Sequence, residues 1–161
     1  MSSSKYEFPP LLPDGIHEMT LEKLQDLCVT SFPLSKTRES TMLDIEELCN
    51  ALSSNKLEAE VWVDGSFLTG KIDPMDSDIA VRLDGVAYES ATKKQKQIVD
   101  KVKQKGFSNN SKCDSYVFFE YHKNDFRFSI GEGMRDYWIK QYGRSRSQEM
   151  KGIAVIRTPL S

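Results

Sequence analysis

Two apolar runs, Val61-Trp62-Val63 and Ile79-Ala80-Val81, flank a polar loop that begins with Gly65-Ser66 and ends with Asp76-Ser77-Asp78. The first run is nearly continuous in apolar residues, which is typical of a strand covered on both faces. The second run belongs to an alternating pattern, with one face for a core and the other for a site. Because side chains alternate faces along a strand, both carboxylates of the Asp-Ser-Asp group are expected to point the same way.

This loop combines two kinds of ligand chemistry. Two neighbouring carboxylates repel each other unless a cation lies between them, and hard oxygen ligands select Mg²⁺. A glycine before a serine, as in Gly65-Ser66, lets a phosphate approach backbone N–H groups closely. Lys71 lies in the same loop and is a further candidate for phosphate contact, although a solvent-exposed loop lysine is the ordinary reading. The loop therefore predicts a site for a nucleoside triphosphate and Mg²⁺.

A third carboxylate is expected on a later strand. Two-metal phosphoryl-transfer sites use it to hold ions ~3.5–4 Å apart and to activate an attacking hydroxyl. Asp114 stands at the head of an apolar strand and is the favoured candidate; its alternative role is that of a simple strand-opening residue. Glu120 shares its face but lies about 20 Å further along the strand, so at most one of the two reaches the site.

The spacing of these residues resembles the signature of the polymerase-β-like nucleotidyltransferase superfamily. The resemblance rests on Gly65-Ser66, nine intervening residues, Asp76-x-Asp78 and the later Asp114, and it covers Glu60 to Phe119. It implies an α/β (α+β) nucleotidyltransferase fold, a small mixed sheet flanked by helices. It also implies attack of a hydroxyl on the α-phosphate of an NTP, with release of pyrophosphate.

Carried over residue by residue, the resemblance assigns the triphosphate to Gly65 and Ser66. Asp76, Asp78 and Asp114 would hold two Mg²⁺ ions, and Asp114 would also favour deprotonation of the acceptor hydroxyl.

The flanking segments resemble short bacterial nucleotidyltransferase-like proteins. They are Phe8-Pro9-Pro10-Leu11-Leu12-Pro13-Asp14-Gly15-Ile16-His17 and Tyr137-Trp138 through Lys151-Gly152-Ile153. Small members resemble the antitoxin halves of toxin–antitoxin or phage-defence modules, and some add AMP to a tyrosine of a HEPN-type ribonuclease toxin.

The resemblance therefore implies Mg²⁺-dependent transfer of NMP, AMP in the first instance, to a hydroxyl of a protein or RNA. A ribonuclease toxin is one partner of this kind. Two alternatives stay open: an antibiotic-modifying nucleotidyltransferase, and a non-catalytic partner-binding protein of the same fold.

Length and composition predict a globular protein. The 161 residues are 39% hydrophobic and 29% charged, which fits one domain over residues 1–161. Pro9-Pro10 and Pro13-Asp14-Gly15 make residues 1–18 an extended lead-in. No apolar run is long enough for a bilayer, and the first residues lack the apolar core of a signal peptide.

Net charge and cysteine content bear on nucleic-acid binding and on the cellular compartment. The net charge of −2 carries no global nucleic-acid signature, so any basic surface must be local. Three cysteines without a Cys-x-x-Cys pair predict buried free thiols in a cytoplasmic protein. Two local clusters of basic residues could bind RNA or phosphate. The alternative interpretation is a solvent-exposed helix face for the first cluster and a polar loop for the second. The two clusters are Lys93, Lys94, Lys96, Lys101, Lys103 and Lys105, and Arg144-Ser145-Arg146 with Lys140 and Lys151.

Hydrophobic periodicity predicts the order α-α-β-β-α-β-β-α-β. The expected helices are a short one capped by Thr20, then 36–53, then 89–105 with Gly106 as its C-terminal cap, and finally one through 136–139. The expected strands are 60–64, 77–83, 115–121, 126–130 and 153–156, of which 115–121 and 126–130 form a hairpin.

Overall fold

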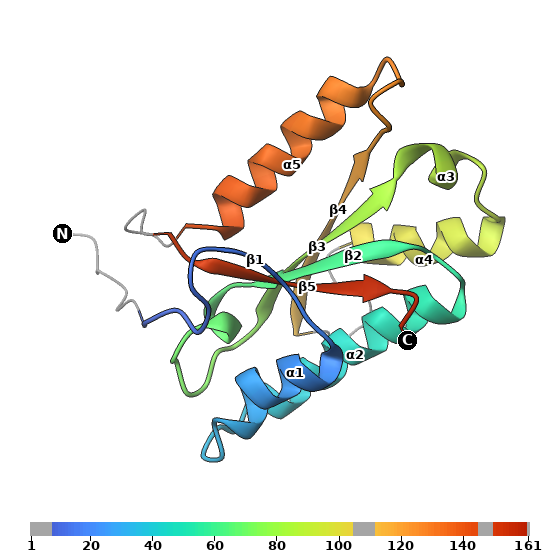
Figure 1. Ribbon diagram of the computed structural model, residues 1–161. Coiled ribbons are helices and arrows are strands. Elements are labelled where there is room, and N and C mark those ends of the chain that lie inside the picture. Colours follow the sequence, from blue (N-terminus) through green and yellow to red (C-terminus); the bar gives the residue numbers. More distant parts are fainter. Residues whose placement is uncertain (1–7, 105–111, 145–149, 161) are drawn as a thin grey trace.

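The computed structural model describes residues 8–104, 112–144 and 150–160. Within these residues the chain forms a five-stranded mixed sheet of order β1-β5-β2-β3-β4, with helices on both faces (Figure 1). The predicted class, a small mixed sheet flanked by helices, is confirmed. The strands are β1 (Gly15–Glu18), β2 (Ala59–Asp64), β3 (Ser77–Asp84), β4 (Cys113–Glu120) and β5 (Gly152–Thr158). The α-helices are α1 (Leu21–Gln25), α2 (Arg38–Ser54), α3 (Gly85–Glu89), α4 (Lys93–Lys103) and α5 (Phe128–Tyr142); η1 (Asp26–Thr30) is a π-helical turn and η2 (Ser66–Leu68) a 3₁₀ turn.

The two strands expected around the polar loop form the centre of the sheet. β2 and β3 are antiparallel, with Val61 opposite Val81 and Asp64 opposite Asp78. Every residue of β2 is buried, as expected for a strand covered on both faces. β3 is parallel to β4, so the heads of these two strands meet at one end of the sheet.

Two apolar layers cover the sheet, one on each face. Figure 1 shows α1, α2 and α4 on one face and α5 alone on the other. The first layer packs Ile79, Val81 and Leu83 against α2 and α4. The second layer packs Trp62 and the other inward residues of its face against α5. Both faces of β3 therefore follow the predicted alternation, and the face that carries Asp78 is the one under α5.

One predicted strand is wrong. Residues 126–130 do not pair with β4, because α5 begins at Phe128 and continues through both Gly131 and Gly133. The alternation of Phe126, Phe128 and Ile130 resembled a strand, and the glycines resembled breakers. Gly131 instead allows close packing of the helix, because a Cβ there would lie 2.9 Å from the Cα of Glu120 in β4.

Two further differences concern shorter elements. The expected lead-in contains β1, which lies parallel to β5 with Ile16 opposite Ile153; four residues with two polar side chains gave too little periodicity to predict it. The expected helix 89–105 is divided into α3 and α4. Thr92 interrupts it by forming a capping box with Gln95. The expected C-terminal cap at Gly106 lies outside the described residues.

Two further predictions concern the cysteines and membrane-spanning segments. Cys28, Cys49 and Cys113 are free, buried thiols, as expected. Among the helices in the described part of the chain, none is sufficiently long and apolar to cross a membrane.

A fully buried arginine anchors the loop between β2 and β3. Arg38, the first residue of α2, is 0% exposed. Its Nη1 donates to the carbonyls of Cys28 (2.9 Å) and Phe67 (2.6 Å), and its Nη2 donates to those of Thr69 and Lys71 (both 2.6 Å). No carboxylate forms an ion pair with it in the parts of the chain described here. Carbonyl dipoles therefore compensate the charge.

Arg38→Met should destabilise the fold by about 3 kcal/mol or more, because it leaves several buried carbonyls without a donor. Chemical denaturation checks this. The matched control is Arg157→Met: this side chain is 59% exposed and pairs with Glu18 at 2.7 Å and with Glu60 at 3.5 Å. Since Glu60 keeps Arg135 as a partner, roughly 1 kcal/mol or less is expected there. Equal losses in both variants would contradict the anchoring role.

Candidate functional site

Three carboxylates lie side by side at one end of the sheet, on the adjacent strands β2, β3 and β4. Asp64 ends β2, Asp78 is the second residue of β3, and Asp114 is the second residue of β4. Asp64 is the register partner of Asp78, and Asp78 is the register partner of Asp114. All three belong to the face covered by α5, because the residues two positions along each strand, including Trp62, pack in that layer. We call this set the carboxylate row.

Asp76 adds a fourth acid beside the row. It is exposed and lies just before β3. Burial raises the pKa of Asp78 first, and the charges of Asp76 and then Asp114 raise it further, while Lys151 lowers it. Asp76 and Asp114 are therefore both close enough to Asp78 for their charges to act on it.

Asp64 is the member of the row that sequence reasoning missed. It is 1% exposed, and neither of its carboxylate oxygens accepts a well-aligned hydrogen bond within the described residues, although the N–H of Gly65 and the ammonium group of Lys151 are close enough to lower its pKa. The Nζ atom of Lys151 lies 3.5 Å from its Oδ2. Burial raises the pKa of Asp64 to about 7, against the opposing charge of Lys151. An acid at the end of an otherwise apolar strand, directly before Gly65-Ser66, was the available signal.

Gly65 makes room for the row. Its φ of +87° favours glycine, and a Cβ at this position would lie 2.8 Å from Oδ2 of Asp78. Ser66 opens η2, and its carbonyl accepts hydrogen bonds from the N–H (3.1 Å) and Oγ1 (2.7 Å) of Thr69. The backbone of Gly65 therefore lies against Asp78; that this turn binds phosphate stays a prediction.

Lys71 lies further along the same loop. Its carbonyl is one of the groups bound by Arg38, and its ammonium group forms no ion pair with any described residue. Asp73 serves the loop structurally, because its Oδ1 accepts hydrogen bonds from Ser35 Oγ (3.2 Å) and Lys36 N (2.7 Å).

Two tyrosine hydroxyls complete the surroundings of the row. Tyr116 Oη donates to Oδ2 of Asp114 across 3.3 Å. The buried Tyr142 Oη has no hydrogen-bond partner among the described residues. Burial raises the pKa of Tyr142, and the charges of Asp78 and Asp64 raise it further. Neither tyrosine was a predicted site residue, because α5 and β4 bring them to the row only in the folded protein.

The donor chemistry of the row suits Mg²⁺, since every side chain is a hard oxygen ligand and mutual repulsion favours a cation between them. The side chains are not arranged as a closed cage, because no three His, Cys, Asp or Glu groups among the described residues converge on one point. Reorientation of at least one carboxylate, such as the exposed Asp76, would accompany cation binding.

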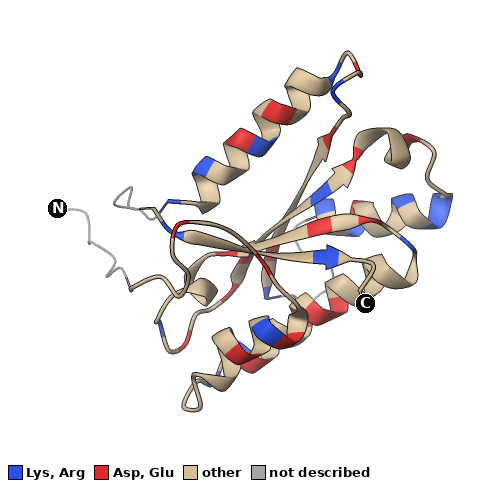
Figure 2. Cartoon of the chain, viewed as in Figure 1, with Lys and Arg blue, Asp and Glu red and all other residues tan. Residues whose placement is uncertain are grey.

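Most of the predicted basic residues lie elsewhere. α4, with its lysines marked in Figure 2, packs on the face of the sheet opposite α5 and the row. Arg144 forms an isolated bridge with Met150, and Arg146 lies outside the described residues. Lys151 is the one member of the second basic group that the described structure places against the carboxylates.

Glu120, the alternative third carboxylate, is far from the row and already paired. Its Oε1 lies 2.7 Å from Arg82 Nε and 2.9 Å from Arg135 Nη1. Register alone shows the separation, because Glu120 is opposite Asp84 and Asp114 is opposite Asp78. Of the two candidates, Asp114 is the one that lies in the row.

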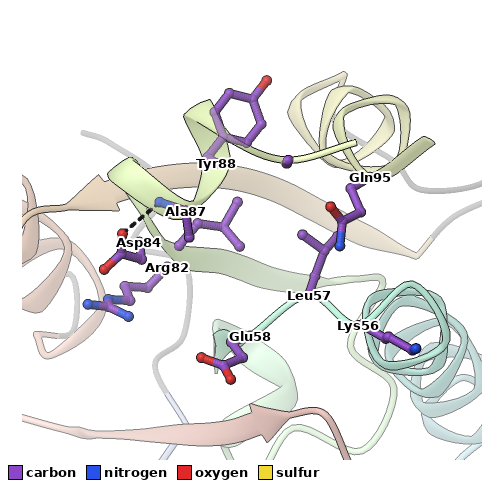
Figure 3. A pocket seen from close by; sticks show the side chains of 10 residues that line it. Lys56, Leu57, Glu58, Arg82, Asp84, Ala87, Tyr88 and Gln95 are labelled. Atoms are coloured by element: carbon purple, nitrogen blue, oxygen red, sulfur yellow. Dashed lines mark hydrogen bonds between the residues drawn. The ribbon is translucent and has the colours of Figure 1, made fainter. Parts of the chain in front are cut away.

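A separate pocket of about 260 Å³ opens at the other end of β3 (Figure 3). Several of its polar groups are already used by the fold: Asp84 Oδ1 accepts from Ala87 N (2.9 Å), and Gln95 Nε2 donates to Asn55 O (2.8 Å). Its lining contains none of the predicted site residues. It is formed by Lys56, Leu57, Glu58, Arg82, Leu83, Asp84, Ala87, Tyr88, Ala91 and Gln95.

Comparison with known protein families gives one assignment. A family model described as "Family of unknown function (DUF6932)" matches residues 6–157. The chain belongs to this family. A search of curated proteins and a search of solved structures found no match. The DUF6932 match spans every strand and helix described above, save the last residue of β5, and it includes the whole carboxylate row.

Gly65→Ala should cost about 1–3 kcal/mol of unfolding free energy, because it forces a side chain into a positive-φ position and against Asp78. Denaturant unfolding measures this. Gly70→Ala, in the same loop, is the control: its Cβ would meet nothing nearer than 3.5 Å, so a change of roughly 0.5 kcal/mol or less is expected. An unchanged free energy of unfolding in Gly65→Ala would contradict the close approach of Gly65 to Asp78.

Asp64 should make stability depend on pH. Its pKa is raised from 3.8 to about 7 in the folded state, so the folded chain holds a proton that the unfolded chain has lost. Wild-type stability should therefore fall as pH rises from 4 to 7, by at most about 1.4 kcal/mol per pH unit. Asp64→Asn should reduce this fall, leaving the part that comes from Asp78, whose pKa is also raised, when unfolding is measured with a chelator present. Parallel pH profiles for both proteins would contradict the expectation.

Proposed function

We propose that the protein is a Mg²⁺-dependent nucleotidyltransferase that moves NMP from an NTP to an acceptor hydroxyl. The carboxylate row carries this proposal: acids on three adjacent strands face the same side, and the central one, Asp78, lies against Gly65 of the Gly65-Ser66 turn. Holding this much negative charge together destabilises a fold unless the site has a cationic ligand to bind. The signature resemblance and the geometry of the row support the same assignment.

Asp76, Asp78 and Asp114 are the residues that would hold Mg²⁺. When bound, the cation would supply charge neutralisation for the triphosphate and for the leaving pyrophosphate. Lys151 already lies 3.5 Å from Asp64 at one end of the row. Its ammonium group would offset the negative charge of the Asp64 carboxylate at the end of β2.

The acceptor hydroxyl would lose its proton to Asp114. This carboxylate is partly exposed, and the hydrogen bond from Tyr116 Oη to its Oδ2 leaves Oδ1 to take the proton as the hydroxyl attacks the α-phosphorus. The new P–O bond forms while the bond between the α- and β-phosphates breaks. Gly65 and Ser66 would present the backbone of their turn to the phosphates.

The acceptor class comes from the resemblance to small bacterial nucleotidyltransferase-like proteins. It favours a hydroxyl of a protein or RNA, with a ribonuclease toxin as one such partner and the cytoplasm as the compartment.

A second role for the same architecture is partner binding without catalysis. One observation favours it: no three candidate ligands in the described residues converge on a single point. This role predicts a fold that is indifferent to Mg²⁺ and nucleotide.

Thermal unfolding with Mg²⁺ and each of the four NTPs separates the two roles. One metal–NTP pair should stabilise the wild type, by about 2.7 kcal/mol when the ligand is at 100 times its Kd. Asp78→Asn should abolish that shift, because it removes a charge from the centre of the row. Asp100→Asn, exposed on α4 on the other face, should retain it. No shift with any NTP would remove the enzymatic proposal and favour partner binding.

A further inference from the structure

Lys151 supplies the carboxylate row with a cation from its own chain. Its Nζ atom lies 3.5 Å from Oδ2 of Asp64, and its side chain is 15% exposed. Asp64 is the register partner of Asp78, and the positive charge of Lys151 opposes the rise in pKa of both carboxylates. The ammonium group therefore lies within reach of two neighbouring acids, on the β2 side of the row.

Backbone packing keeps Lys151 at this place. Its N–H donates to the carbonyl of Gly143 (2.8 Å), directly after α5. The next residue, Gly152, opens β5, and its N–H donates to the carbonyl of Leu12 (3.2 Å). A Cβ at Gly152 would clash with the carbonyl of Pro13. The closely packed backbone therefore limits how far the ammonium group can move from Asp64.

The two sides of the row differ in their access to solvent. Asp64 is 1% exposed, whereas Asp78 and Asp114 are partly exposed and Asp76 is exposed. Mg²⁺ gives up its hydration water reluctantly and keeps several waters when it is bound. A hydrated ion can therefore approach the row from β3 and β4. The β2 side offers it only a buried carboxylate that already has Lys151 as a neighbour.

The charge of the row leads to the same division. When Asp76 and all three carboxylates of the row are ionised, Lys151 offsets only part of their negative charge. One divalent ion nearly balances the remainder, whereas a second would reverse the sign of the net charge. That second ion would also lie close to the ammonium group, and like charges repel strongly where water is excluded.

We propose that Lys151 is the second cation of the row, so that the nucleotide-free chain takes one Mg²⁺ ion instead of the two expected from the sequence. Asp76, Asp78 and Asp114 would hold this ion, and the exposed Asp76 would turn toward Asp78 when it binds. The inference rests on the Mg²⁺ site of the proposed function, but not on nucleotidyl transfer. Lys151 is in this sense a positioning residue, because it keeps Asp64 as its own partner.

A count of bound ions tests the proposal. Mn²⁺ can stand in for Mg²⁺, because both prefer oxygen ligands, and its paramagnetic resonance signal reports the unbound ion. Titration of the metal-free full chain without nucleotide should give one bound Mn²⁺ per chain, which an excess of Mg²⁺ displaces. Two bound ions in the wild type would overturn the inference and leave the proposed function intact. No bound ion up to millimolar concentrations would overturn the Mg²⁺ site, and the inference with it.

Removal of the ammonium group should open the second position. Lys151→Ala should bind two Mn²⁺ ions, because Asp64 then lacks a cation and has space beside it. Mn²⁺ should also raise the melting temperature of this variant by more than that of the wild type. Lys140→Ala is the matched control, since Lys140 is exposed near the end of α5, and it should bind one ion. A single bound ion in Lys151→Ala would overturn the role of Lys151.

A double variant keeps the test valid if Lys151→Ala does not fold. Asp64→Asn combined with Lys151→Ala leaves no unpaired charge on the β2 side, so the chain should fold. It should bind one Mn²⁺ with the dissociation constant of the wild type. Loss of this ion, or a dissociation constant raised by about tenfold or more, would show that Asp64 is itself a ligand of the divalent ion and would overturn the proposal.

Discussion

The buried guanidinium of Arg38 is the interaction on which the arrangement of the loop between β2 and β3 depends. It joins carbonyls from η1 and from the loop, contributed by Cys28, Phe67, Thr69 and Lys71, to the first turn of α2. The aromatic ring of Phe32 lies 3.8 Å from the guanidinium carbon. A cation that replaces its hydration shell with carbonyl dipoles and a ring face is costly to disturb, so the loop is held without any help from a ligand.

This anchoring matters because the neighbouring carboxylates work against the fold. Asp64 and Asp78 are register partners with burial-raised pKa values, and only Lys151 lowers both. Pairing of β2 with β3 holds Asp64 opposite Asp78, and the loop anchored by Arg38 places Gly65 against Asp78. Burial and mutual repulsion of these acids lower the free energy of unfolding, and local destabilisation of this kind is typical of functional sites.

The central part of the fold and most of the candidate site could be predicted because their signals are local. The β2 and β3 strands, α2 and the Asp76-x-Asp78 spacing follow from hydrophobic periodicity and from motif. The Phe126–Ile130 strand failed because α5 uses Gly131 for close contact with β4, which no local pattern reveals. β1 is too short to show periodicity, and it exists because β5 offers a parallel edge.

By itself the sequence determined which residues can supply phosphate and cation chemistry, because residue type and strand alternation are local properties. Only the tertiary structure decided that Asp64 and Lys151 join Asp78, that Asp114 rather than Glu120 stands beside it, and that the Tyr142 hydroxyl lies within reach of their charges. The reason is register: neighbours across strands depend on the alignment of segments distant in sequence.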